Sequence, residues 1–402
     1  MTHKPSVDEY LCALMDSVEP LECEDFPLTS TPQLRFIAED IKARLPIPRF
    51  DNSAVDGYAV CTRDLTGSGP WILKVAGDTP AGAAAGTLIQ GEAVRVMTGA
   101  HVPKSSEEFC IVPVELTNAP SDHRLVEQIT VLERPRKSNV RTAGEHLHEG
   151  EIAIEAGTAC DAGSIATLIS VGVDTVSAHR TPRVTVITTG DELEPDNPWG
   201  IPNSNGPMLV AALQRLGIPH ALHLHAADDQ ESLKAAFDQV SAKSDFIITV
   251  GGISAGAFDV VKLLGQRTGG FEFFPIAMSP GKPQGHGTWK DTKVLCLPGN
   301  PVAAWVSFQL FAVPLIRRLA GGKKVTTIKD LPGVLLSSNR ELPAREGILS
   351  AVPVTIDWAQ QVARSTPHRS HMVGALAGSD GIAIVQENAV AQGDPVRVIL
   401  GM

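Results

Sequence analysis

The sequence predicts a multidomain protein that combines an α/β domain with β domains. The chain has 402 residues, which at roughly 150 residues per domain leaves room for several cores. Strand-like and helix-like segments alternate from residue 182 to residue 319, whereas short β-like segments rich in Gly and Pro lie before and after them. Such alternation is typical of a parallel sheet with helices on both faces. We therefore expect a central three-layer α/β domain with a mostly parallel sheet.

The N-terminal part of the chain shows helical patterns that an unrelated segment interrupts. Apolar residues at helical spacing predict a helix over residues 7–18, which Pro20 ends. A second helix is predicted from Pro32 to Ala43, and a third over residues 162–171. We therefore expect a split helical N-terminal domain, made of residues 1–47 and 139–178.

Short β-like segments predict two further domains. Four of them predict an inserted β domain over residues 48–138, and they span residues 71–75, 93–97, 110–114 and 125–131. Beyond Gly321 and Gly322 the chain again repeats Pro and Gly without helical periodicity, which predicts a C-terminal β domain over residues 323–402.

The segment between these β domains, residues 179–322, carries the α/β pattern. Strands are predicted over residues 184–188, 221–225, 246–250 and 295–297, and helices over residues 208–216, 231–242 and 258–268. A long helix from Pro301 to Leu319 follows, in which Pro314 predicts a kink. Its most apolar stretch contains Ser307 and Gln309 and is short for a membrane span, so we expect no direct membrane insertion.

Composition narrows the class of protein. The chain has 45 acidic and 34 basic residues, a net charge of −11, and so lacks the basic surface of a nucleic-acid binder. The six cysteines show no Cys-x-x-Cys spacing, which favours reduced, buried thiols over a zinc site or a disulfide framework. With no apolar leader at the N-terminus, we expect a cytoplasmic protein. Any anionic ligand must then be bound by local positive charge.

Glycine-rich loops follow the predicted strands of the α/β domain. They cover residues 189–192, 251–256, 279–283 and 298–301. Each alone is compatible with ordinary turn chemistry, but the carboxyl ends of the strands in an open α/β sheet share one edge, where ligands bind. Glycines let a ligand approach the backbone, and none of the loops matches the P-loop or dinucleotide fingerprints. The sequence therefore predicts a site for another phosphorylated small molecule.

Two polar segments are candidates for the chemistry. Asp191 and Glu192 would repel a phosphate unless a hard cation such as Mg²⁺ lay between them, although Asp191 could equally cap the following turn. The segment from Pro48 to Val60 carries Asp56 and other small polar residues, as in a loop presented to a ligand. A turn that leads into a strand is the alternative interpretation there.

Taken together, these segments resemble the molybdopterin molybdenumtransferase family, to which the C-terminal domain of gephyrin also belongs. The resemblance rests on residues 50–60, 94–100, 189–193, 251–256, 280–283 and 297–302. It implies an elongated homodimer with a cleft between the α/β domain of one subunit and the β domain of the other. It further implies that a phosphorylated pterin, adenylylated molybdopterin, receives molybdate with release of AMP, assisted by Mg²⁺.

The resemblance also implies the site residues. Catalytic roles fall to Asp56, Thr98, Asp191, Glu192 and Lys282, of which Asp56, Asp191 and Glu192 would also bind the metal. The ligand would be bound by Gly190, Gly251, Gly252, Ser254, Gly256, Asp259, Gly281, Pro283, Pro298, Gly299, Asn300 and Ser370. Lys282 would hold an oxyanion.

Several positions depart from the family pattern. His146 and Asn203 stand where the family usually has Asp, Ala257 where an acidic residue is common, and Ser279 where a Lys is expected. Lost positive charge weakens the binding of an oxyanion, and lost carboxylates weaken the binding of Mg²⁺. An alternative function is therefore a gephyrin-like scaffold that binds a membrane-receptor peptide or a tubulin-like cytoskeletal protein. Such a partner would recruit the protein to the membrane.

Overall fold

The computed structural model describes residues 4–30, 33–120, 124–193, 198–253, 259–365 and 369–401. Contacts divide the chain into two compact units. The first comprises Met1–Glu39, Ala156–Asp161 and Ser177–Met402, and the second comprises Asp40–Glu155 and Ala162–Val176. Ser254 and Gly256, two predicted ligand-binding residues, lie outside the described residues, as does Ala257. The finer division into four domains stays a prediction.

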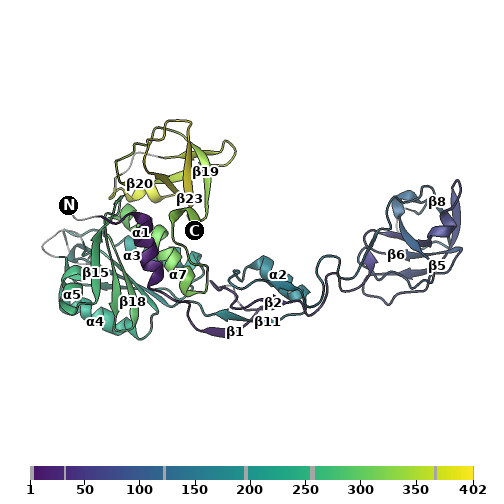
Figure 1. Cartoon of the computed structure of the whole chain (residues 1–402), viewed down its shortest axis with the longest axis horizontal. Coiled ribbons are helices and arrows are strands. Elements are labelled where there is room, and N and C mark those ends of the chain that lie inside the picture. Colours follow the sequence, from purple (N-terminus) through teal and green to yellow (C-terminus); the bar gives the residue numbers. More distant parts are fainter. Residues whose placement is uncertain are drawn as a thin grey trace. The chain divides into compact units, whose positions relative to one another are not determined.

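A six-stranded mixed sheet forms the centre of the first unit (Figure 1). Its order is β13 (Leu222–Ala226), β12 (Val184–Thr189), β14 (Phe246–Val250), β18 (Thr292–Leu297), β17 (Pro283–Trp289) and β15 (Phe271–Pro275). The first four strands are parallel, but β17 and β15 are antiparallel to their neighbours, so the sheet is less parallel than expected. For β17 the reason is the tight turn at Lys290 (φ 52°) that joins it to β18, since so short a connection permits only antiparallel pairing.

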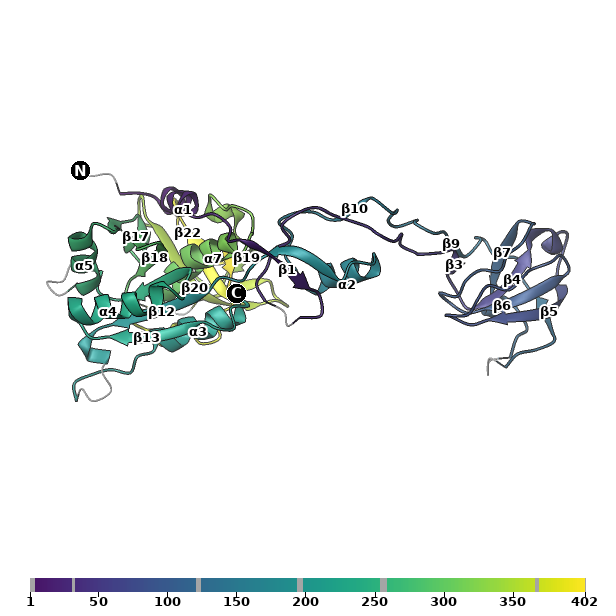
Figure 2. The same cartoon turned by 90° about the horizontal axis from the view of Figure 1, so that it is seen from below.

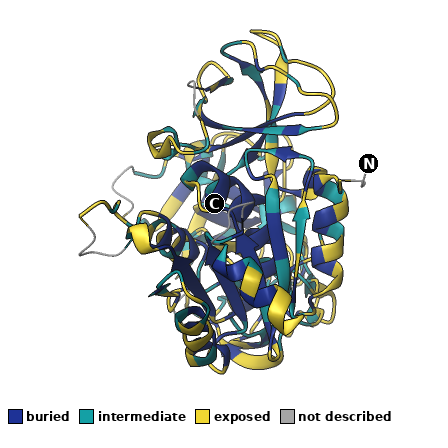
Figure 3. Ribbon diagram, turned by 90° about the vertical axis from the view of Figure 1, so that its left-hand side faces the viewer, coloured by how far each residue is buried: buried dark blue, intermediate teal, exposed yellow. Residues whose placement is uncertain are grey.

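Helices cover both faces of this sheet, which confirms the three-layer prediction. Successive residues of a strand point to opposite faces. Phe246 and Ile248 therefore pack into one core with α1 (Val7–Asp16), α3 (Asn205–Arg215) and the long C-terminal helix. Ile247 packs into the other core with α4 (Gln230–Ser241) and α5 (Val260–Thr268). Figure 3 shows the buried strands between helices whose outer surfaces are exposed.

The long helix runs from Pro301 to Leu319 and is a core helix, most of which is buried. It consists of α6 (Pro301–Ser307), a π-helical segment (Phe308–Ala312) and α7 (Val313–Leu319). Just before Pro314, where a kink is predicted, the helix forms a wider π turn. Proline has no N–H to donate to the preceding turn, and a π segment is one way to accommodate that loss.

The predicted helix over residues 32–43 is wrong. Pro32 lies outside the described residues, and residues 33–43 contain no helix. Phe36 and Ile37 instead form bridges to Ala159 and Ala178, and β2 (Ile41–Lys42) pairs with β10 (Ile152–Ile154). Pairing with distant segments thus overrides local helix propensity. The two other predicted helices form as α1 in the first unit and α2 (Ala162–Ser170) in the second.

The second unit contains the expected β domain, a curved five-stranded sheet (Figure 2). Its order is β7 (Phe109–Pro113), β4 (Gly57–Cys61), β6 (Glu92–Val96), β5 (Trp71–Thr79) and β8 (Gln128–Val131). All residues of β4 are buried. The segment from Pro48 to Val60, interpreted above as a loop presented to a ligand, therefore ends in a strand within the sheet. This agrees with the alternative interpretation, a turn that leads into a strand.

The C-terminal part of the first unit is a closed five-stranded barrel, which confirms the predicted C-terminal β structure. Its strands are β20 (Leu349–Asp357), β21 (Val362–Arg364), β19 (Gly333–Ser338), β23 (Pro395–Leu400) and β22 (Gly381–Val385), and a pairing between β22 and β20 closes it. β16 (Met278–Ser279) adds to β20 and so joins the barrel to the α/β part. The remaining short strands are β1 (Cys23–Pro27), β3 (Asn52–Ser53), β9 (Val140–Arg141) and β11 (Thr175–His179).

Candidate functional site

The candidate site is a pocket of about 1180 Å³ in the first unit, beyond the carboxyl ends of β12, β14 and β18. From β12 the chain continues to β13, which lies on one side of β12, and then to β14, which lies on its other side. The strand order therefore reverses between β12 and β14. Such a switch point leaves a crevice between the loops that leave the two strands in opposite directions. Residues of the C-terminal barrel form the opposite wall.

Glycines allow the loops at this edge to approach one another. Gly251 has φ +103°, and a Cβ there would lie 2.9 Å from the carbonyl oxygen of Thr189. A Cβ on Gly299 would lie 3.4 Å from the Cα of Gly251. Any side chain at Gly251 would therefore clash with the end of β12, and the glycine leaves the backbone accessible to a ligand.

Carboxylates gather at one end of the pocket. Asp228 follows β13, and its backbone N–H donates to Oδ1 of Asp191 at 2.8 Å. Thr189 Oγ1 donates to Oδ1 of Asp228 at 3.3 Å. Burial, together with the negative charges of Asp191, Glu192 and Asp259, raises the pKa of Asp228 despite that bond. This end of the pocket therefore attracts cations.

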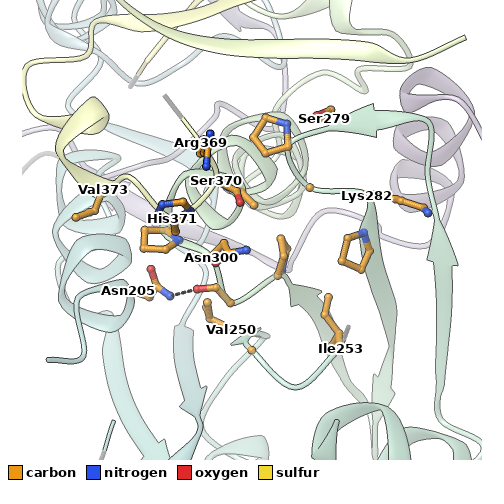
Figure 4. Close-up of a pocket in the computed structure, with 18 of the residues that line it drawn as sticks. Asn205, Val250, Ile253, Ser279, Lys282, Asn300, Arg369, Ser370, His371 and Val373 are labelled. Carbon is orange, nitrogen blue, oxygen red and sulfur yellow. Dashed lines mark hydrogen bonds between the residues drawn. The ribbon is translucent and has the colours of Figure 1, made fainter. Parts of the chain in front are cut away.

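Two buried oxygen atoms in the pocket that can only accept hydrogen bonds have no partner among the described residues. One is Oδ2 of Asp259, which precedes α5 and does not cap it with its side chain. The other is Oδ1 of Asn205, whose Nδ2 donates to the carbonyl oxygen of Gly299 at 2.6 Å (Figure 4). Because both atoms accept hydrogen bonds, a ligand that supplies donors or a cation there would satisfy them.

Cationic side chains also line the pocket, and most come from the barrel. The pocket is lined by Lys282 and by Arg340, Arg345 and Arg369. Arg345 Nη1 donates to Oγ of Ser279 at 3.2 Å. A guanidinium therefore contacts the position at which the family pattern has a lysine. Figure 4 shows Lys282 on the opposite side of the pocket from His371 and Val373.

Asn203, another departure from the family pattern, makes structural contacts. Its Nδ2 donates to Oγ1 of Thr188 at 2.7 Å, and its Oδ1 accepts from the N–H of Gly206 at 3.3 Å. Thr188 Oγ1 also lies 2.9 Å from Nε2 of His223. The amide thus connects the end of β12 to the start of α3.

Most of the predicted loop residues line this one pocket, although their roles stay predictions. They are Gly190, Glu192, Gly251, Gly252, Asp259, Gly281, Lys282, Pro283, Pro298, Gly299, Asn300 and Ser370. Asp191 adjoins them through its bond to Asp228, so its carboxylate does not merely cap its own turn. Asp228 itself was missed, although it follows a predicted strand of the same sheet.

Asp56 and Thr98, predicted as catalytic, lie in the second unit. Oδ1 of Asp56 accepts from the backbone N–H of Thr98 at 2.6 Å and from its Oγ1 at 2.8 Å. The structure therefore brings these two residues together as a pair. Nearby, Oγ of Ser53 donates to the carbonyl oxygen of Val55 and forms the turn that precedes β4.

Comparisons with known proteins agree over the whole chain. Residues 5–172 match the "MoeA N-terminal region (domain I and II)", and residues 185–318 match the "Probable molybdopterin binding domain". Molybdopterin molybdenumtransferase 2 of Mycobacterium tuberculosis is 34% identical, with 96% of each chain covered. Molybdopterin molybdenumtransferase of Haemophilus influenzae is 35% identical, with 72% of this chain and 71% of that protein covered.

The fold agrees as well. The crystal structure of the molybdopterin biosynthesis MoeA protein from Pyrococcus horikoshii OT3 superposes with a TM-score of 0.79 at 24% identity, covering 99% of this chain and all of that one. With full-length relatives above 30% identity, this chain belongs to the molybdopterin molybdenumtransferase (MoeA) family.

Proposed function

We propose that this protein is a molybdopterin molybdenumtransferase, which inserts molybdate into adenylylated molybdopterin and releases AMP during molybdenum cofactor biosynthesis. The observation that carries the proposal is one pocket lined both by clustered carboxylates and by four cationic side chains. A ligand that combines a metal-bound phosphate with an oxyanion would use both kinds of side chain.

The residues at the acidic end fit Mg²⁺. Magnesium prefers oxygen ligands, keeps several waters, and is commonly bound by one or two carboxylates together with substrate phosphates. The described residues contain no group of three His, Cys, Asp or Glu side chains that could hold a metal ion, which is compatible with such shared binding. One or two of the pocket carboxylates, Glu192 and Asp259, would hold the ion together with substrate phosphates, and the buried Oδ2 of Asp259 favours a cation there. The ion would neutralise phosphate charge.

The cationic side chains of Lys282, Arg345 and Arg369 would bind anionic groups of the ligand. Each hydrogen bond between an ionised donor and an oxyanion contributes about 1.5–3 kcal/mol. The glycine loops would hold the phosphates through backbone N–H groups, and Oδ1 of Asn205 would accept a donor of the pterin or adenine. Because Arg345 contacts Ser279, this pocket retains positive charge at the position of the expected lysine.

We also propose that the protein is a cytoplasmic homodimer, in which Asp56 and Thr98 of one subunit complete the cleft of the other. Support comes from the family pattern and from the paired geometry of these two residues. Their carboxylate and hydroxyl would orient the ligand or water at the reacting phosphate.

Complementation tests the proposed function. Expression of the protein in cells that lack their own insertase should restore the activity of a molybdenum enzyme, and the purified protein should release AMP from adenylylated molybdopterin when molybdate is present. Lys282→Ala should abolish both effects while the protein stays folded. Failure of the wild-type protein in both assays would refute the proposal and favour the scaffold function.

A further inference from the structure

A second cavity, of about 320 Å³, lies in the first unit and shares no lining residue with the candidate site. The long helix lines it, together with the end of β23 and the segment around Leu331. The buried part of the lining is mostly apolar, and Phe36, Val313, Leu331 and Ile399 are each less than a tenth exposed. The volume is within the range of pockets that bind small organic molecules.

Gln309 adds a buried polar group to this apolar lining. The residue is 4% exposed, and its Nε2 has no hydrogen-bond partner in the described part of the chain. By contrast, Nε2 of the buried Gln284 donates to the carbonyl oxygen of Gly281 and to Oγ of Ser307, both at 2.7 Å. A buried donor that the fold leaves unsatisfied is uncommon in native proteins. Gln309 also lies in the π-helical segment, and π turns occur frequently at functional sites.

The charged side chains of the described lining interact with the protein or with water. The guanidinium carbon of Arg317 lies 5.1 Å from the centre of the Phe36 ring, so this cation packs on the wall of the cavity. The carboxylate of Asp330 accepts the backbone N–H of Thr327 at 3.0 Å, and Lys323 is exposed at the rim. A charged ligand would lose its hydration in so apolar a cavity, whereas a neutral ligand avoids most of that cost.

We propose that this cavity is a binding site for a small neutral molecule with an apolar body and one hydrogen-bond acceptor, such as the carbonyl oxygen of a ketone. The oxygen would accept from Nε2 of Gln309, and the body would contact the apolar lining. Because the unsatisfied group is a donor, the ligand must supply an acceptor. A ketone supplies one without adding a donor that the apolar lining would leave unpaired. This site is independent of the proposed insertase function.

Acetophenone is a suitable probe, and α-methylstyrene is its matched control, because a CH₂ group replaces the carbonyl oxygen in a molecule of nearly the same shape. Acetophenone should raise the melting temperature of the full-length protein in a concentration-dependent way. Gln309→Met keeps the length of the side chain but removes the donor. It should weaken acetophenone binding about three- to tenfold and leave α-methylstyrene binding unchanged. Val325→Trp, at a half-buried position of the lining, should fill the cavity and abolish the binding of both molecules.

Charged counterparts of the probe test the class of ligand on the wild-type protein, without any substitution. Benzoate and benzylamine should leave the melting temperature unchanged, because each would lose the hydration of its charge in the cavity. Stabilisation by either of them equal to that by acetophenone would overturn the proposal. It would also be overturned if acetophenone failed to stabilise the wild type, if Gln309→Met changed the binding of acetophenone and α-methylstyrene equally, or if a folded Val325→Trp protein bound acetophenone as well as the wild type does.

Discussion

Replacement of Asp245 should weaken the sheet that carries the site. This residue directly precedes β14, and its carboxylate accepts from Nη2 of Arg180 at 2.7 Å and from the backbone N–H of Arg183 at 2.8 Å. The N–H of Asp245 in turn donates to the carbonyl oxygen of Arg183 at 2.8 Å. These bonds align the starts of β12 and β14, whose opposite ends carry the site loops. We therefore choose Asp245→Asn as the perturbation.

The exposed fractions of the three side chains set the size of the effect. Asp245 is 7% exposed, Arg180 is 19% exposed and Arg183 is 55% exposed. Breaking a buried ion pair by removing one charge costs about 3–5 kcal/mol, whereas exposed pairs contribute about 1 kcal/mol or less. Since only one of the two arginines is mostly buried, we expect Asp245→Asn to lower the free energy of unfolding by about 2–4 kcal/mol.

The loss should depend on pH in a defined direction. Burial raises the pKa of Asp245, but hydrogen bonds from Arg180 and Arg183 outweigh burial and hold it well below its usual range. A depressed pKa in the folded state gives stability that is fully present above the unfolded-state pKa, about 3.9, and is lost as the pH falls through the folded-state value. The difference between wild type and Asp245→Asn should therefore be constant from pH 7 to about pH 5 and shrink below about pH 4.

Urea unfolding followed by tryptophan fluorescence can measure this difference. Trp71 is the only tryptophan of the second unit, so in a Trp71→Phe background the fluorescence reports on the first unit. Asp238→Asn is the matched control, because its lysine partners Lys234 and Lys290 are 58% and 61% exposed, and its loss should be much smaller. Equal losses for the two variants, or a difference that grows in acid, would refute the reasoning.

Three further predictions concern the site. If two subunits share each cleft, mixing Lys282→Ala with Asp56→Ala subunits should restore about a quarter of wild-type activity. Half of the dimers would contain one subunit of each variant, and one of the two clefts in such a dimer would be intact. No recovery of activity would place both residues in one subunit's cleft. Glu192→Gln should reduce the Mg²⁺-dependent part of the thermal stabilisation by AMP, and equal stabilisation with and without Mg²⁺ would remove the metal hypothesis. Gly251→Ala should lower the free energy of unfolding by about 1–3 kcal/mol, because φ is +103° at this residue. Urea unfolding can measure the loss, and an unchanged free energy of unfolding would contradict the close approach to Thr189.

How well the sequence predicts an element depends on where its contacts lie. β14 spans Phe246–Val250, the same residues as predicted, because a strand buried on both faces is a continuous apolar segment. β17 was missed, since its middle residues, Gln284 to Gly287, carry no β-like pattern. Residues 33–43 look helical locally but pair with segments more than 100 residues away. Where long-range pairing decides the structure, local pattern misleads.

The same distinction applies to the site. The glycine loops could be predicted because the carboxyl ends of parallel strands share one edge of the sheet. Asp228 follows a predicted strand and could have been included on the same ground. Arg345 and Arg369 could not, because they belong to the barrel and reach the pocket only through its packing against the α/β part. The sequence therefore predicted the acidic residues of the pocket better than its basic residues.

That asymmetry bears on how departures from a family pattern are interpreted. A serine at position 279 suggested a lost charge in a chain that is already acidic, and hence a weakened enzyme. The pocket nevertheless contains Arg345, whose guanidinium contacts that serine. An oxyanion responds to the field at its position, whichever segment supplies the charge. Sequence comparison position by position therefore underestimates the positive charge of this pocket, and the insertase function is better supported by the folded chain than by its motifs alone.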